Sequence, residues 1–186
     1  MAVYFPKAGK ENTEETLRIA FEEAEKRGIR HIVVASTRGE TGLLAAQMAK
    51  GKRIKVIVVT HNTGFSRPGQ QEMPEDVRRR IEETGAVVYT GTMVLRGLGT
   101  AVKGRAGFSH EQIVADTLRM FGQGMKVVCE MAAMVADAGL VPTDQDIVVV
   151  AGTGRGADTA AIIQPRPSNM FFDMKVREIL CKPRDF

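Results

Sequence analysis

Apolar residues in the first part of the chain recur at two spacings, one typical of helices and one of buried strands. From Leu17 to Ala24 they follow the helical period. Asn12 with Glu15 three residues later resembles a capping box, in which each residue caps backbone near the other. The pattern therefore predicts an amphipathic helix that ends at Gly28.

Three short runs rich in β-branched residues follow and predict strands. They are HIVVAS at 31–36, IKVIVVT at 54–60 and AVVYT at 86–90. The helical pattern LLAAQMAK follows the first run, and a helix with Pro74 at its first position and Gly85 at its end follows the second. Strands that alternate with helices are typical of a parallel sheet in an α/β domain.

The stretch from Gly91 to Gly107 is basic and rich in glycine. It is too long for an idle connection in a compact domain, so we expect a lid or a ligand-binding loop. Ser109 and Gln112 form a second capping-box pattern, which predicts the start of a helix. A further helix, apolar over much of its circumference, is expected to be deeply buried and to end at Gly139.

Two more strands are expected at 147–151 and 160–163. The short glycine loop between them leaves no room for a crossover helix, so the second strand must pair antiparallel with the first. The whole pattern predicts a three-layer α/β/α domain with one antiparallel strand.

Length and composition indicate a single globular domain over residues 1–186. Hydrophobic residues make up 44% of the chain and charged residues 26%, and no apolar run approaches the roughly 20 residues that cross a bilayer. The segment MAVYFPKAGKENTEE lacks the apolar core of a secretory signal. Cys129 and Cys181 have no metal-binding spacing, so we expect a reduced, cytoplasmic protein without a metal site.

The net charge is +4, and residues 96–126 contain five basic and two acidic side chains. This local excess is too weak for a nucleic-acid-binding face, which presents many Lys and Arg side chains with interleaved aromatic residues. It fits a site for a small anion better.

The segment STRGET at 36–41 lies where a parallel strand ends and a helix begins. Unpaired N–H groups and the positive end of the helix dipole favour an anion at such a turn. Hydroxyl groups, a guanidinium and a glycine that permits close approach strengthen this interpretation. An ordinary N-cap made of Ser and Thr produces the same pattern, so both interpretations stay open.

The segment GTGRGADT at 152–159 also follows a strand. Gly152, Gly154 and Ala157 match a dinucleotide-binding fingerprint, with Asp173 about 20 residues further on. That fingerprint must open a helix, whereas a strand-like run and two prolines follow here, so we do not expect NAD binding. What remains is a glycine nest with an arginine and two threonines, suited to phosphate or to a tight bend.

Thr60, His61 and Asn62 follow the second predicted strand. His61 is the candidate catalytic residue, as a general acid or a ligand donor, and a structural histidine is the alternative. Ligands of open α/β sheets bind beyond the carboxyl ends of the strands, where the strand order reverses. We expect that point between 36–41 and 152–159, with His61 on its flank.

Two segments, IVVASTRGETGLLAAQMA and IVVVAGTGRGADTAAIIQP, resemble the C-terminal domain of pyruvate kinase and its small stand-alone archaeal relatives. The resemblance implies a five-stranded mixed sheet of order 3-2-1-4-5 with strand 5 antiparallel. In regulated pyruvate kinases the first loop holds a phosphate of an allosteric sugar bisphosphate. The barrel domain that carries the transfer chemistry has no counterpart here, so the resemblance implies no kinase activity.

The segments THNTGF and RGADTA are similar to the stand-alone relatives, and that similarity implies flavin mononucleotide (FMN) as the ligand, without a metal. The implied pocket combines both hydroxyl-rich loops with His61 and the glycine-rich stretch that begins at Gly91. The candidate cofactor-binding residues are Ser36, Thr37, Arg38, Gly39, Thr41, Thr60, His61, Asn62, Gly91, Thr92, Arg105, Gly152, Thr153, Gly154, Arg155, Gly156, Ala157, Asp158 and Thr159.

These observations together predict a protein that binds a phosphorylated small molecule, with FMN as the first expectation. One alternative is a flavin-dependent oxidoreductase or a phosphometabolite hydrolase, with His61 as acid or base and Arg155 or Arg105 as anion clamp. Another is an effector-sensing subunit that docks on another protein. No nucleophile and base pair is visible, so enzymatic activity stays open. We expect a homo-oligomer with neither nucleic acid nor membrane as a partner.

Overall fold

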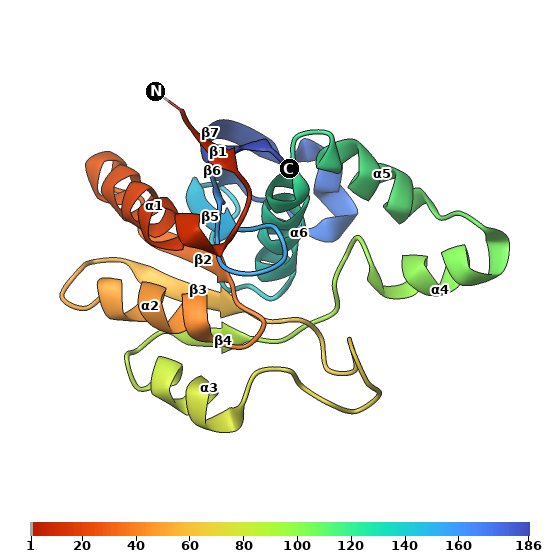
Figure 1. Cartoon of the computed structure of the whole chain (residues 1–186), viewed down its shortest axis with the longest axis horizontal. Coiled ribbons are helices and arrows are strands. Elements are labelled where there is room, and N and C mark those ends of the chain that lie inside the picture. Colours follow the sequence, from red (N-terminus) through yellow and green to blue (C-terminus); the bar gives the residue numbers. More distant parts are fainter. Residues whose placement is uncertain (1) are drawn as a thin grey trace.

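The computed structural model of the chain describes residues 2–186 and contains one seven-stranded sheet with helices on both faces (Figure 1). The strands are β1 (Val3–Lys7), β2 (His31–Ala35), β3 (Lys55–Val59), β4 (Val87–Tyr89), β5 (Ile147–Ala151), β6 (Thr159–Gln164) and β7 (Lys175–Asp185). The helices are α1 (Thr13–Arg27), α2 (Glu40–Met48), α3 (Glu75–Glu82), α4 (Gly97–Ala106), α5 (His110–Arg119) and α6 (Gln123–Asp137), with short 3₁₀ helices η1 (Lys10–Asn12) and η2 (Ser168–Asp173).

The strand order is β1-β7-β6-β5-β2-β3-β4. Strands β2 to β5 run parallel, β6 pairs antiparallel with β5 as expected, and β7 pairs antiparallel with β6. The expected five-stranded sheet of order 3-2-1-4-5 was wrong, because β7 and β1 extend the sheet beyond β6. Neither strand has a long apolar run: β7 begins with four exposed residues, and β1 buries only Phe5 and contains Pro6.

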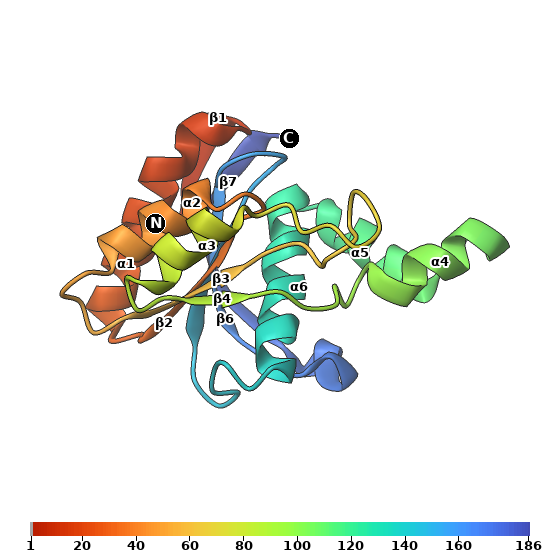
Figure 2. The ribbon, with the colours of Figure 1, turned by 90° about the horizontal axis from the view of Figure 1, so that it is seen from below.

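Alternate residues of the central strands face two separate cores, as the two-residue period of a strand requires. Val34 and Val58 pack with α1, α2 and α3 on one face, whereas Val33 and Ile57 pack with α6 on the other. Figure 2 shows α1, α2 and α3 on one side of the sheet and α6 on the other. Within residues 2–186, no helix is long and apolar enough to cross a membrane.

Two predicted helix starts differ from the structure. Helix α1 begins at Thr13, and Asn12 does not cap it, because its Nδ2 donates to the carbonyls of Lys7 at 2.9 Å and Gly9 at 3.2 Å. Pro74 is the N-cap of α3 rather than its first residue, so its ring precedes the helix. Asn12 thus holds the N-cap position without its capping bond, the start of α3 differs by one residue, and both helices are confirmed.

The basic stretch after β4 is not the loop that the sequence predicts, because residues 97–106 form α4. Helix α4 projects from the body of the domain in Figure 2. Glycine lowers helix propensity by about 1 kcal/mol relative to alanine, so the three glycines of this segment weakened the helical pattern in the sequence. The Ser109 hydroxyl caps α5 by accepting the N–H of Gln112 at 3.2 Å, but the Gln112 side chain binds Asp116 instead of returning to the cap.

Candidate functional site

A cleft with two adjoining lobes lies beyond the carboxyl ends of β2, β3 and β5. The first lobe has a volume of about 410 Å³ and the second about 320 Å³, both within the range of small-molecule sites. Thr37, His61, Phe65 and Gln123 line both lobes, so the two adjoin. The cleft therefore lies where the sequence analysis expected the ligand, between 36–41 and 152–159.

The first lobe receives the N-terminus of α2 from one face of the sheet. Ser36 Oγ accepts the N–H of Gly42 at 3.0 Å, while the N–H groups of Glu40 and Thr41 have no hydrogen-bond partner within residues 2–186. Gly39 precedes the helix with a φ of 98°, and a Cβ there would overlap a side chain of α3. This start of α2 therefore leaves backbone donors free to bind an anion.

Helix α6 begins at the same lobe from the opposite face of the sheet. Gly122 precedes it with a φ of 117°, and the N–H groups of Gln123 and Gly124 are unpaired within the described part of the chain. The Gln123 side chain lines the lobe and accepts a hydrogen bond from Arg119 Nε at 2.8 Å. Two helix dipoles thus present their positive ends to one cavity.

The glycine loop after β5 forms another wall of the first lobe. The residues of this loop that line the lobe are Gly152, Gly154, Arg155 and Gly156. Arg38, which follows β2, lines the lobe as well. Gly152 fits only without a side chain, because a Cβ would lie 2.5 Å from the carbonyl oxygen of Gly156. The loop therefore brings its backbone and a guanidinium to the cavity, as the sequence predicted.

Asp158 turns away from the cleft and holds the glycine loop in place. Its side chain is fully buried, and its Oδ2 accepts the N–H groups of Thr153 at 3.1 Å and Gly9 at 3.3 Å. Its Oδ1 accepts the hydroxyl of Thr159 at 2.8 Å. Ala157 is also buried, with its N–H bonded to Thr13 Oγ1 at 3.0 Å. These inward-facing groups tie the loop to the start of the chain.

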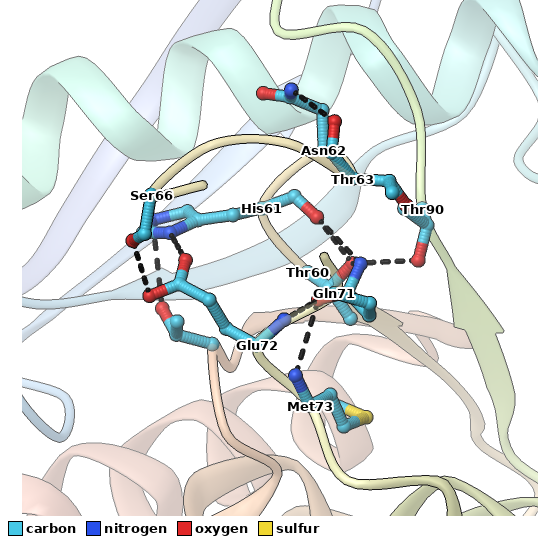
Figure 3. Close-up of polar contacts among 10 residues, drawn as sticks. Thr60, His61, Asn62, Thr63, Ser66, Gln71, Glu72, Met73 and Thr90 are labelled. Carbon is cyan, nitrogen blue, oxygen red and sulfur yellow. Dashed lines mark hydrogen bonds and ion pairs between the residues drawn. The ribbon is translucent and has the colours of Figure 1, made fainter. Parts of the chain in front are cut away.

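His61 is held by a carboxylate on the 60–73 loop, as Figure 3 shows. His61 Nδ1 lies 2.7 Å from Glu72 Oε2, and Ser66 Oγ donates to the other Glu72 oxygen at 2.9 Å. His61 Nε2 lies 3.5 Å from Thr37 Oγ1. Burial raises the pKa of the Glu72 carboxyl, but the hydrogen bonds from His61 and Ser66 outweigh it, so that pKa lies below the ordinary value of 4.5.

Phe65 lies between two cationic or ionisable groups. Its ring stacks on the imidazole of His61 with centroids 3.8 Å apart, and the guanidinium carbon of Arg96 lies 3.8 Å from the ring centroid. Thr60 Oγ1 fixes the base of the same loop through a hydrogen bond of 2.7 Å with Thr90 Oγ1. The 60–73 loop is thereby bound to its surroundings by side chains of several segments.

The second lobe has a thioether floor and a basic wall. Met93, Met131 and Met134 contribute the floor, and the charged residues that line the lobe are Arg96, Lys103, Arg119, Lys126 and Glu130. Lys126 and Glu130 form a buried ion pair, with side chains 4% and 1% exposed. The sequence analysis missed this pair. Its only signal was two charges four residues apart in an otherwise apolar helix.

The structure brings ten of the candidate residues to the cleft: Ser36, Thr37, Arg38, Thr41, Thr60, His61, Gly152, Gly154, Arg155 and Gly156. Nine others do not line it: Gly39, Asn62, Gly91, Thr92, Arg105, Thr153, Ala157, Asp158 and Thr159. Arg105 is exposed near the end of α4, where Arg96 and Lys103 of the same segment line the second lobe instead. Among residues 2–186, no group of three His, Cys, Asp or Glu side chains is arranged to hold a metal.

Three solved structures to which the chain is similar are distant likenesses. A pyruvate kinase from Cryptosporidium parvum matches with a TM-score of 0.43 and 14% identity, over 81% of this chain and 22% of that one. An O-ureido-L-serine synthase matches with a TM-score of 0.32 and 17% identity, over 59% of this chain and 29% of the other. A hydrogen sulfide-producing enzyme from Fusobacterium nucleatum matches with a TM-score of 0.33 and 20% identity, over 53% and 30%. The chain thus spans less than a third of the length of each.

Comparison of the sequence with protein-family models identifies the family of the chain. The model of the family described as pyruvate kinase, alpha/beta domain, matches residues 14–163, which include β2, the glycine loop and β6 up to Ile163. That range contains the first segment on which the resemblance was based, the second segment up to Ile163, and both helix N-termini of the cleft. The chain belongs to the pyruvate kinase alpha/beta domain family.

Proposed function

We propose that this protein binds a phosphorylated small molecule, with the phosphate in the first lobe and the body of the molecule in the second. The observation that carries the proposal is that α2 and α6 both begin at one cavity with unpaired N–H groups. Each helix N-terminus stabilises an anion by about 0.3–1 kcal/mol at an exposed site and more when partly buried. Arg38 and Arg155 add positive charge to the same lobe.

FMN is the ligand that we propose to test first, on the strength of the resemblance stated above. The residues present fit such a molecule: backbone donors suit its phosphate, Ser36 and Thr37 offer hydroxyls to its polyol, and the methionine floor suits a flat ring. A bound flavin would supply electron-transfer chemistry. The cytoplasmic location and the homo-oligomer remain predictions.

The test compares FMN with riboflavin, which has the same ring and polyol but no phosphate. Purified protein should bind FMN, and at 100 times the dissociation constant the ligand should add about 2.7 kcal/mol of stability, visible as a higher Tm. Arg155→Gln should weaken FMN binding and leave riboflavin binding unchanged, whereas the control Arg30→Gln, which is remote from the cleft, should affect neither. Equal affinities for the two flavins, or no uptake of FMN, would contradict the proposal.

A second candidate function is acid–base catalysis on the bound molecule. The observation in its favour is the chain of groups Glu72, His61 and Thr37, in which the carboxylate orients an imidazole whose Nε2 faces a hydroxyl across 3.5 Å. A carboxylate that holds a histidine in this way prepares it to accept a proton from a hydroxyl or a water molecule. We propose hydrolysis of a phosphate ester as the reaction to examine.

Phosphate release from a panel of phosphorylated metabolites tests that reaction. His61→Ala and Glu72→Gln should each lower turnover by about two orders of magnitude, the usual contribution of a positioned acid–base group. The exposed histidine His110 provides the control variant His110→Ala. Wild-type protein without phosphate release, or turnover unaffected by His61→Ala, would remove this candidate.

A further inference from the structure

The second lobe contains a buried ion pair that phosphate binding does not use. Lys126 Nζ contacts Glu130 Oε2, and Glu130 Oε1 accepts the N–H of Leu95 at 2.8 Å. Each carboxylate oxygen therefore has a partner. The ammonium has three N–H donors, and within residues 2–186 it uses one of them, on Glu130.

The Lys126 ammonium lies on an otherwise apolar helix and takes no part in the hydrogen bond from Leu95 to Glu130. The helix is otherwise lined with apolar side chains such as Met125, Val128 and Met131, all nearly fully buried. Removing two charges from water is costly, and apolar residues of similar size at a buried ion pair are often as stable or more stable. A buried lysine with unused donors at the wall of a cavity therefore indicates a ligand contact.

The charges of the lobe indicate what that ligand carries. Glu130 is the one acidic side chain among the lining residues, whereas Arg96, Lys103, Arg119 and Lys126 are basic. Glu130 is already paired, and the remaining surface combines positive charge with the methionine floor. Such a surface suits a flat apolar body that bears a negative charge or carbonyl oxygens.

We propose that Lys126 binds an anionic or carbonyl acceptor at the end of the ligand opposite its phosphate, and that Glu130 is a positioning residue for its ammonium. The proposal rests on the two-lobe binding proposed above and defines the class of ligand more narrowly. The molecule carries a phosphate at one end and an acceptor-bearing planar ring at the other. Flavins are one such class.

The variant that tests the proposal is Lys126→Met with Glu130→Gln, since removal of the lysine alone would leave a buried carboxylate unpaired, and the amide oxygen of glutamine can still accept the N–H of Leu95. The double variant should stay folded, because it leaves neither a buried charge without a partner nor this N–H without an acceptor. It should bind both FMN and riboflavin about tenfold more weakly, because the lost contact is to the ring rather than to the phosphate. Lys52→Met, which lies on the surface near α1, is the matched control. Unchanged riboflavin affinity in the folded double variant overturns the proposal.

A probe without phosphate separates this proposal from the FMN assignment. If the wild type takes up neither flavin, the FMN assignment fails, and 8-anilinonaphthalene-1-sulfonate, a flat aromatic anion, then tests the lobe alone. The wild type and the Lys52→Met control should bind this probe about tenfold more tightly than the double variant. Equal affinities, or no binding by the wild type, overturn the assignment of Lys126.

Discussion

Replacement of Asp158 tests whether the glycine loop is held from inside the domain. The carboxylate is fully buried and accepts three hydrogen bonds, from Thr153, Gly9 and Thr159. The bond to Gly9, at 3.3 Å, is the longest, so the bonds from Thr153 and Thr159 contribute most. At about 1.5–3 kcal/mol for each bond to a charged group, Asp158→Ala should lower the free energy of unfolding by about 3–6 kcal/mol.

Asp158→Asn should cost much less, about 1–2 kcal/mol. The carbonyl oxygen of the asparagine can still accept the N–H of Thr153. The asparagine amide can donate to the hydroxyl of Thr159, which then accepts a hydrogen bond instead of donating one. Urea denaturation at pH 7, followed by circular dichroism, measures both variants. The midpoint should fall with the slope m unchanged, and a protein of this size should lose roughly 2–4 °C of Tm per kcal/mol.

Two results would refute this reasoning. One is an Asp158→Ala variant within about 1 kcal/mol of the wild type, since that would mean that the three bonds contribute little net stability. The other is loss of FMN affinity in folded Asp158→Asn protein that keeps near-native stability. That result would return Asp158 to the ligand-binding residues, where the sequence motif first placed it.

Three further predictions concern the loop, the cleft and the thiols. Folding lowers the pKa of Glu72, so its carboxylate contributes stability above about pH 4.5, and this stability is lost as the pH falls through the folded-state pKa. In a series of urea midpoints measured at different pH values, Glu72→Gln should reduce this loss of stability at low pH. Gly154 has a φ of 80° with open space around it, so Gly154→Val should lower the free energy of unfolding by about 1–2 kcal/mol in thermal unfolding and weaken FMN binding. A variant as stable as the wild type would show that the left-handed backbone at this position imposes no strain on a side chain. Burial raises the pKa of both Cys129 and Cys181 to about 11, so neither should react with a thiol reagent at pH 8 until urea unfolds the chain. Rapid reaction of the thiols in the folded protein would show that the core opens.

The first lobe was predictable because each of its walls is continuous in sequence. A buried strand followed by STRGET, and another followed by GTGRGADT, place polar groups at one edge of a parallel sheet whatever the rest of the chain does. The same reasoning could not separate residues that face the cleft from those that face inward. Asp158 belongs to the motif, yet its direction depends on Gly9, which lies 149 residues away in the chain.

The two added strands show the opposite case, in which local pattern carries little information. Strand β7 is paired on both sides, but most of its residues are exposed, so it has neither a buried run nor clean alternation. Strand β1 is short and contains Pro6, which is tolerated at the edge of a sheet. Their places are set by pairing with β6 and with each other, which no short window of sequence contains.

The ion pair in the second lobe was missed for a physical reason that also bears on the function of the lobe. Lys126 and Glu130 have the four-residue spacing of a solvent-exposed ion pair on a helix surface, a pattern that occurs on many helices and contributes little. Burial of the pair depends on the approach of residues 93–96, which reach α6 through the hydrogen bond that the backbone N–H of Leu95 donates to the Glu130 carboxylate. The same contact closes the lobe and sets the lysine in its wall. The lysine that we assign to ligand binding is therefore buried by tertiary packing, and it lines the lobe with two N–H donors that no residue within 2–186 accepts.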